Sequence, residues 1–107
     1  MKRIGIIFAM KEELDSLLKY LKIEKEYNIF DLKFYEGMIH NNYCILTESG
    51  VGKVNSARCT QILIDNMDVD MIINIGVAGG ISDKLKVCDI VIGEKLVQHD
   101  FDITAFN

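Results

Sequence analysis

Proline is absent from this 107-residue chain, and neither an internal repeat nor a low-complexity tract interrupts it. Since no segment resembles a flexible linker and the length suits one domain better than two, we expect residues 1–107 to belong to a single domain. Cysteine is also scarce. Cys44, Cys59 and Cys88 are odd in number and widely spaced, which fits neither a disulfide scaffold nor a paired zinc motif. We expect reduced thiols in a cytoplasmic protein.

An excess of basic residues is lacking as well, because 12 lysines and arginines face 16 aspartates and glutamates, for a formal net charge of −4. A nucleic-acid partner is therefore not expected. No apolar run approaches the ~20 residues that a membrane-spanning helix requires, so a membrane is not expected either. With 50% hydrophobic and 26% charged residues, the composition is typical of a globular protein with a buried core.

Apolar periodicity predicts that a helix follows the first strand directly. Residues 3–9 form a short, mostly apolar run, typical of a strand buried on both faces of a parallel sheet. A helix is predicted over residues 11–22, where leucines recur with a helical period at Leu14, Leu17, Leu18 and Leu21. A strand followed at once by a helix begins an α/β unit.

The next elements are an antiparallel hairpin, a second helix and two further strands. Runs at 32–39 and 43–49 flank His40-Asn41-Asn42, and asparagine tolerates the positive φ of tight hairpin turns. After a glycine-rich entry, the second helix is predicted over about 53–66, with inward candidates Val54, Ala57, Ile62 and Leu63. Runs 71–80 and 89–98 predict two buried strands. The order indicates an α/β fold with a mixed central sheet flanked by helices.

Two glycine-rich segments fail as phosphate or dinucleotide motifs. TESGVGK has Thr47 and Val54 where a phosphate-binding loop requires glycine and serine or threonine. GVAGG at 76–80 lacks the dinucleotide spacing, so no nicotinamide cofactor is expected. A strand ending at Gly79-Gly80 leaves the backbone open to a flat ligand, although a tight structural turn explains the same glycines.

Glu13 differs from its acidic neighbour in its place on the first predicted helix. Successive helical residues are about 100° apart, so Glu13 lies at the edge of the leucine stripe, whereas Glu12 lies on the opposite face. Of the two, Glu13 is the one able to border a cleft. A carboxylate in the first turn of a helix also interacts favourably with the helix dipole, and geometry alone leaves that structural interpretation open.

Several segments together resemble the 5′-methylthioadenosine/S-adenosylhomocysteine nucleosidases. They are IGIIFAMKEEL at 4–14, ESGVGKVNSA at 48–57, and INIGVAGGISDKLKVCDIVI at 73–92, followed by QHDFDITAF at 98–106. The similarity runs over nearly the whole chain in one order. It implies the nucleoside phosphorylase fold, a homodimer, a small-molecule nucleoside substrate, and hydrolysis of the adenine–ribose bond without a cofactor.

The resemblance also implies roles for individual residues. Glu13 matches the acid that activates the attacking water. Met10 and Val51 match apolar positions near the sugar and its sulfur substituent, which a flexible thioether and a small side chain suit. Ala78 and Gly79 match positions that line the adenine pocket.

Three more positions carry implications. Val77 stands where many relatives have a serine whose hydroxyl helps to hold the water, and we count Val77 among the substrate-binding positions. Ile103 and Phe106 match residues that reach across the dimer to cover the 5′-alkylthio group of the neighbouring site. His99, Asp100 and Asp102 alternate in direction along one predicted strand end, and the resembled family uses no metal, so no metal site is expected.

The family pattern continues past residue 107 with the acid that protonates adenine, the glutamate that holds the ribose hydroxyls and the aromatic residue that stacks on the base. We therefore expect this chain to be the amino-terminal part of a truncated domain, without measurable activity by itself.

Three alternatives stay open. A purine or uridine phosphorylase requires cationic groups around phosphate, and Arg3 and Arg58 offer no convincing clamp, while the acidic segment 11–14 favours water. A futalosine-type hydrolase differs in the 5′ substituent, for which Ile103 and Phe106 favour an apolar thioether. From another class, the chain is a non-catalytic remnant or a dimerising piece.

Overall fold

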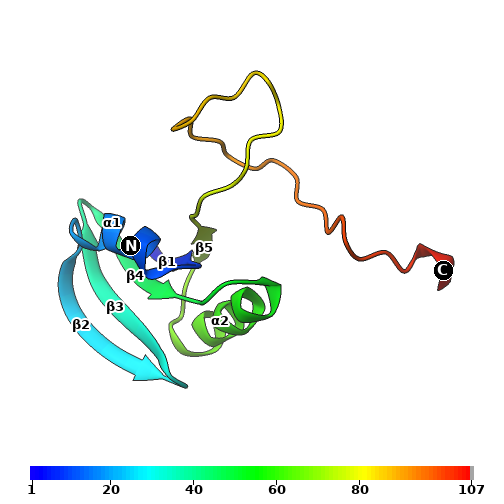
Figure 1. The fold of residues 1–107 in the computed structure, drawn as a ribbon. Coiled ribbons are helices and arrows are strands. Elements are labelled where there is room, and N and C mark those ends of the chain that lie inside the picture. The colour runs from blue at the N-terminus through cyan, green and yellow to red at the C-terminus, as the bar shows by residue number, and fades with distance from the viewer. Residues whose placement is uncertain (107) are drawn as a thin grey trace. The chain divides into compact units, whose positions relative to one another are not determined.

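The computed structural model of the protein describes residues 1–106, which fall into two units that divide after Val77. The first unit holds the regular structure apart from one short turn of helix (Figure 1). Its elements in chain order are β1 (Arg3–Phe8), α1 (Lys11–Leu18), β2 (Lys22–Ile29), β3 (Leu32–Ile39), β4 (Asn42–Glu48), α2 (Lys53–Asn66) and β5 (Met71–Asn74).

The strands form one mixed sheet in the order β2-β3-β4-β1-β5. β1 pairs in parallel with both β4 and β5, whereas β3 pairs antiparallel with β2 and β4. α1 and α2 pack against opposite faces, because alternate residues of β1 point to opposite sides. Ile7 joins the core under α2, and Ile6 joins the core under α1. The prediction of a mixed sheet flanked by helices is confirmed.

Most predicted elements of the first unit are present. The strand at 3–9, the hairpin and the helix at 53–66 occur within a residue or two of the predicted bounds. In the hairpin turn it is His40, with φ 51°, that takes the left-handed conformation. The helix from residue 11 ends at Leu18 instead of residue 22, yet Leu21 still packs in the core as the chain turns toward β2.

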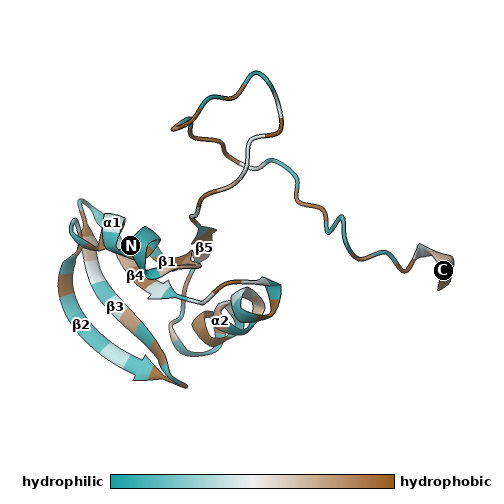
Figure 2. Ribbon diagram, in the orientation of Figure 1, coloured by the Kyte–Doolittle hydropathy of each residue, from teal (hydrophilic) through white to brown (hydrophobic). Residues whose placement is uncertain are grey.

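The sequence analysis missed one strand and misjudged one helix face. β2 is an edge strand with mostly exposed, hydrophilic residues (Figure 2), and it is held by hydrogen bonds to β3 and by Tyr27 and Ile29, which pack against the core. On α2, Ile62 and Leu63 are buried as predicted, but Val54 is 83% exposed and Ala57 is also exposed. The first turns of α2 extend beyond the sheet that buries its later residues.

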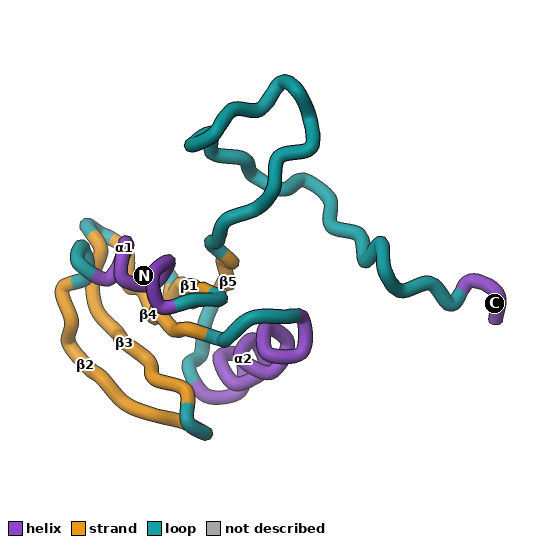
Figure 3. Tube along the Cα trace, in the orientation of Figure 1, coloured by secondary structure: helices purple, strands orange, loops and turns teal. Residues whose placement is uncertain are grey.

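The second unit consists of turns and loops, with one 3₁₀ turn at Thr104–Phe106 (Figure 3). The predicted strand at 89–98 is wrong, and the strand predicted over 71–80 ends at Asn74. A buried strand requires a hydrogen-bonding neighbour on its edge. Within residues 1–106 the 89–98 run pairs with none, and Ile90 and Ile92 are 94% and 90% exposed.

A buried carboxylate organises the sheet near the amino ends of β1 and β4. Glu36 is 4% exposed and accepts hydrogen bonds from the hydroxyls of Tyr27 and Tyr43, the latter at 2.7 Å, and from Arg3 at 3.3 Å. Arg3 also donates to the Met67 carbonyl at the end of α2, at 2.9 Å. Burial alone would raise the pKa of Glu36, but these hydrogen bonds and the Arg3 charge outweigh it and hold that pKa below its ordinary value.

Replacing this carboxylate destabilises the fold. Glu36→Gln keeps the side-chain shape but removes the charge that two hydroxyls and a guanidinium share, so we expect a loss of about 2 kcal/mol in the free energy of unfolding at pH 7. Glu24→Gln, which changes an exposed carboxylate on β2, is the matched control and should shift it by less than about 0.5 kcal/mol.

Acid should reduce the difference in unfolding free energy between Glu36→Gln and Glu24→Gln. The folded state lowers the pKa of Glu36, so its carboxylate contributes its full stability above the unfolded pKa of about 4.3. That contribution is lost as the pH falls through the folded pKa. Denaturant titrations of both variants between pH 7 and pH 2 test this. An equal loss in Glu36→Gln and Glu24→Gln, or a gap that widens in acid, would contradict the assignment.

Candidate active site

Three parallel strands end at one edge of the sheet, and the candidate site lies there. The carboxyl ends of β1, β4 and β5 meet at this edge because the strands run in the same direction. Two hydrogen bonds fix the chain as it leaves the sheet: Ser49 N donates to the Phe8 carbonyl at 2.8 Å, and Ile75 N donates to the Ile7 carbonyl at 3.0 Å. Ligands of open α/β sheets bind outside the carboxyl ends of such strands.

Glu13 connects the start of α1 with the chain that leaves β5. Met10 caps the helix, and its backbone N–H donates to Glu13 Oε1 at 3.0 Å, while Leu14 N closes the first helical turn on the Met10 carbonyl. The other carboxylate oxygen, Oε2, accepts the backbone N–H of Val77 at 2.9 Å. The side chain is half-buried. Each oxygen keeps a second lone pair, so the carboxylate retains the capacity to accept a proton from another group.

Gly76 allows the carboxylate to approach the chain so closely. A Cβ built on Gly76 would lie 2.9 Å from Glu13 Oε2, closer than a carbon and an oxygen can pack without displacement. Gly76 therefore makes room for Glu13, which lies 63 positions earlier in the sequence. The next residue, Val77, donates its backbone N–H to the same carboxylate oxygen. The sequence analysis considered Gly76 only within a failed dinucleotide motif.

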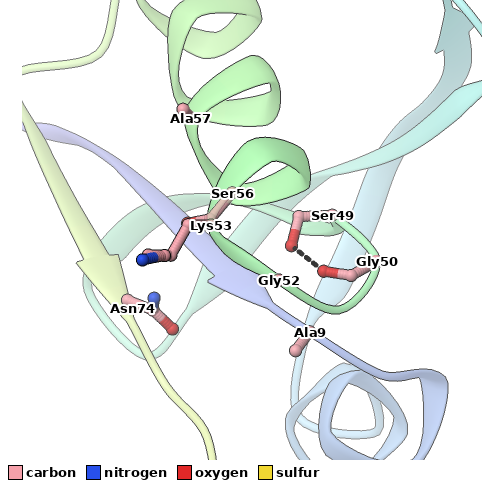
Figure 4. Close-up of a pocket in the computed structure, with 8 residues that line it drawn as sticks. All are labelled: Ala9, Ser49, Gly50, Gly52, Lys53, Ser56, Ala57 and Asn74. Atoms are coloured by element: carbon pink, nitrogen blue, oxygen red, sulfur yellow. Dashed lines mark hydrogen bonds between the residues drawn. The ribbon is translucent and has the colours of Figure 1, made fainter. Parts of the chain in front are cut away.

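A cavity of about 490 Å³ lies where β1, β4 and β5 end and α2 begins (Figure 4). Gly52, with φ 101°, takes a conformation that favours glycine and turns the chain into α2. In the close-up, Lys53 and Asn74 point into the same space from α2 and β5. Ser49 is buried and its hydroxyl donates to the Gly50 carbonyl at 2.8 Å.

Four of the predicted site residues lie in the first unit, and hydrogen bonds bring three of them, Met10, Glu13 and Val77, together. Met10 is 37% exposed at the helix cap, and Val51 is 68% exposed in the loop between β4 and α2. Val77 is 81% exposed and reaches Glu13 through its backbone, not its side chain. A side-chain hydroxyl at position 77 is thus not needed for that contact.

The other predicted residues belong to the second unit. Ala78 and Gly79 open it, and no atom lies within 4 Å of a Cβ built on Gly79. Ile103 is 49% exposed and Phe106 is 85% exposed, next to and within the 3₁₀ turn. The Ile103 carbonyl accepts the Phe106 N–H at 2.9 Å, which closes that turn.

Sequence reasoning missed Ser49, Lys53 and Asn74 as residues that line the cavity. The sequence analysis assigned a role to none of these three residues. The available signal was their position: each lies within two residues of the end of a parallel strand or the start of the helix that follows.

Neither a metal cluster nor a membrane helix is found in the part of the chain that the structure describes. Among residues 1–106, no three His, Cys, Asp or Glu side chains gather in a way that could hold a metal ion, and His99, Asp100 and Asp102 are included in that search. No helix over the same residues is long and apolar enough to cross a membrane.

A family model described as the phosphorylase superfamily matches residues 3–107. The chain therefore belongs to the phosphorylase superfamily. The 5′-methylthioadenosine/S-adenosylhomocysteine nucleosidase of Oceanobacillus iheyensis is 44% identical over 104 residues, which cover 97% of this chain and 45% of that protein. The protein of the same name from Staphylococcus aureus is 42% identical over 103 residues, which cover 96% of this chain and 45% of that protein.

Solved structures agree with this family. The S-adenosylhomocysteine nucleosidase from Streptococcus pyogenes, in complex with 5-methylthiotubericidin, superposes with a TM-score of 0.94 at 42% identity, over 98% of this chain and 44% of that one. A futalosine hydrolase mutant of Helicobacter pylori superposes with a TM-score of 0.87 at 34% identity, over 100% of this chain and 48% of that one. The chain thus spans about half the length of the relatives it matches.

Adding one methyl group at position 76 should displace the Glu13 carboxylate. In Gly76→Ala the new Cβ would lie 2.9 Å from Oε2, too close for the carboxylate to stay in position, so we expect the Val77 amide to lose its acceptor. The cost in stability should stay below about 1 kcal/mol, because the clash is with the end of a flexible side chain. Amide hydrogen exchange by NMR measures Val77 directly.

Gly79→Ala is the matched control, because nothing lies within 4 Å of its added carbon. We expect the Val77 amide to exchange at the wild-type rate in that variant. Equal exchange rates at Val77 in wild type and in Gly76→Ala would show that Glu13 does not bind there.

Proposed function

We propose that this chain carries part of the active site of a nucleosidase that hydrolyses the bond between adenine and ribose in 5′-methylthioadenosine and S-adenosylhomocysteine. The observation that carries the proposal is the Glu13 carboxylate, held between the Met10 and Val77 amides at the carboxyl edge of the parallel strands. The names and close identity of the relatives support this substrate class.

Glu13 would act as the general base toward water. Cleavage of the glycosidic bond develops positive charge on the sugar, and water must attack as the bond to adenine breaks. A carboxylate with free lone pairs can orient that water and accept its proton, while the two backbone N–H groups fix the carboxylate without delivering a competing acidic proton. Protonation of the leaving adenine requires a second group, on the other side of the sugar.

The proposal extends to the residues around Glu13. Met10 and Val51 would border the sugar and its sulfur substituent, and Ala78 and Gly79 would line the adenine pocket. Val77 would be a further substrate-binding position. Exposed apolar side chains at positions 10, 51 and 77 support this, because a ligand would cover them.

Assembly and location are part of the same proposal. In a homodimer, Ile103 and Phe106 would cover the alkylthio group of the neighbouring site, and residues 1–107 would form the amino-terminal part of one nucleoside phosphorylase-like domain. A cytoplasmic location agrees with the free thiols of Cys44 and Cys59, whose pKa values are raised by burial and which are therefore unreactive.

Hydrolysis of futalosine is the second candidate, because a solved futalosine hydrolase shares the fold at 34% identity. The apolar character of Ile103 and Phe106 favours a thioether substituent over a polar one. Phosphorolysis is less well supported, because Arg58 donates to the Phe30 carbonyl and to Asp31, and Arg3 is engaged with Glu36 and Met67. Neither guanidinium lines the cavity at the start of α2.

Adenine release from 5′-methylthioadenosine tests the proposed reaction. In a chain extended to the length of its relatives, we expect Glu13→Gln to lower kcat at least about 100-fold, because an amide cannot accept the proton of water. Glu12→Gln is the matched control: it changes an exposed carboxylate on the same helical turn and should leave kcat within about twofold.

The 107-residue chain by itself should release no measurable adenine. Release from that chain would overturn this expectation, and an extended Glu13→Gln enzyme as fast as wild type would remove Glu13 from the reaction. Cleavage of futalosine in place of 5′-methylthioadenosine would favour the second candidate.

A further inference from the structure

A second cavity, of about 370 Å³, continues along the same sheet edge to the point where β4 ends and β3 begins. We call it the β4 groove. It shares Ser49 and Gly50 with the cavity at the start of α2, so the two cavities are adjacent. The groove is more polar than its neighbour in its lining residues, which come from α1, the β2–β3 turn, the end of β4 and α2.

Six charged side chains line the β4 groove, and four of them are already paired with one another. Lys11 Nζ donates to Asp15 at 2.8 Å, and Arg58 donates to Asp31 at 2.5 Å. The remaining two are Lys33 and Glu48. Within residues 1–106 neither has an ion-pair partner, and the Lys33 ammonium lies 5.2 Å from the centre of the Tyr35 ring.

The strand register places Lys33 and Glu48 on the same side of the sheet. The antiparallel ladder ends with the pair Phe34 and Thr47. Lys33 immediately precedes Phe34 in β3, and Glu48 immediately follows Thr47 in β4. Because side chains alternate along a strand, both share the face of Tyr35 and Leu46, which α1 covers. One cation and one anion thus line the same groove, and within residues 1–106 neither forms an ion pair, with the other or with any other side chain.

We propose that the β4 groove binds the α-amino acid end of a ligand, with Glu48 accepting hydrogen bonds from an α-ammonium group and Lys33 donating to an α-carboxylate. A zwitterion offers one charge to each side chain, whereas a simple anion or cation would leave one of them unmatched. The inference rests on the proposed function, since S-adenosylhomocysteine carries an α-amino acid on its sulfur and 5′-methylthioadenosine carries only a methyl group.

The position of Val51 supports this assignment. Val51, proposed to border the sulfur substituent, follows Gly50, which lines both cavities. The longer substituent of a thioether at that point would extend into the β4 groove. Lys33 and Glu48 would then determine selectivity between the two nucleosides without touching the reacting bond.

The ratio of kcat/KM for S-adenosylhomocysteine to kcat/KM for 5′-methylthioadenosine tests the proposal in the extended enzyme. We expect Glu48→Gln and Lys33→Gln each to lower this ratio about tenfold, the effect of one charge-assisted hydrogen bond. Glu24→Gln and Lys25→Gln, which change exposed charges of the same types on β2, are the matched controls and should leave the ratio as in wild type.

A second measurement is independent of catalysis. L-methionine, which has a thioether and an α-amino acid, is titrated into the 107-residue chain while the amide resonances of Lys33 and Glu48 are followed by NMR. 3-(Methylthio)propylamine, which lacks the carboxylate, is the reference ligand. We expect shifts at both residues with methionine, and smaller ones with the amine or in Lys33→Gln.

The outcomes separate the two proposals. If adenine is released but the ratio in Glu48→Gln and Lys33→Gln equals that of the controls, the groove assignment is overturned and the nucleosidase stands. If neither nucleoside is cleaved, the proposed reaction fails. The methionine shifts then decide the groove by themselves, because their absence overturns it and their loss in Lys33→Gln supports it.

Discussion

The parallel pairing of β1 with β4 on one side and β5 on the other is the interaction on which the rest of the structure depends. It brings three strand ends to one edge, and it joins segments from the beginning, middle and later part of the first unit. Alternate β1 side chains supply both cores, with Ile7 facing α2 and Ile6 facing α1. Because α1 begins three residues after β1 ends, the same pairing places the first helical turn, and therefore Glu13, at that edge.

Glu13 is then both a structural link and the proposed catalytic group. Its carboxylate satisfies an amide at the start of α1 and another beyond β5, two backbone donors that the secondary structure leaves without partners. The two hydrogen bonds fix the orientation of the Glu13 carboxylate before any ligand binds, which lowers the entropic cost of orienting it for catalysis. Gly76 permits this contact, because the Cβ of any other residue there would lie too close to the carboxylate oxygen.

Charge is divided between two regions of the first unit. Near the amino ends of β1 and β4, Glu36 is buried with its donors and ties the strands together, so its role is explained by stability. At the carboxyl edge, charged side chains border cavities, and Lys33 and Glu48 line one without pairing. The cavity at the start of α2 and the β4 groove share Ser49 and Gly50, so a ligand longer than a nucleoside could extend from one into the other.

The sequence by itself determined the parts that depend on local pattern. Apolar runs and the leucine period predicted β1, the β3–β4 hairpin and both helices, and the helical geometry separated Glu13 from Glu12. Tertiary structure decided what depends on partners. β2 forms because β3 offers an edge despite its polar residues, whereas the apolar run at 89–98 forms no strand because it meets no neighbour within residues 1–106. The Glu13–Val77 contact and the unpaired Lys33 and Glu48 likewise follow from strand order and register, which local sequence patterns do not encode.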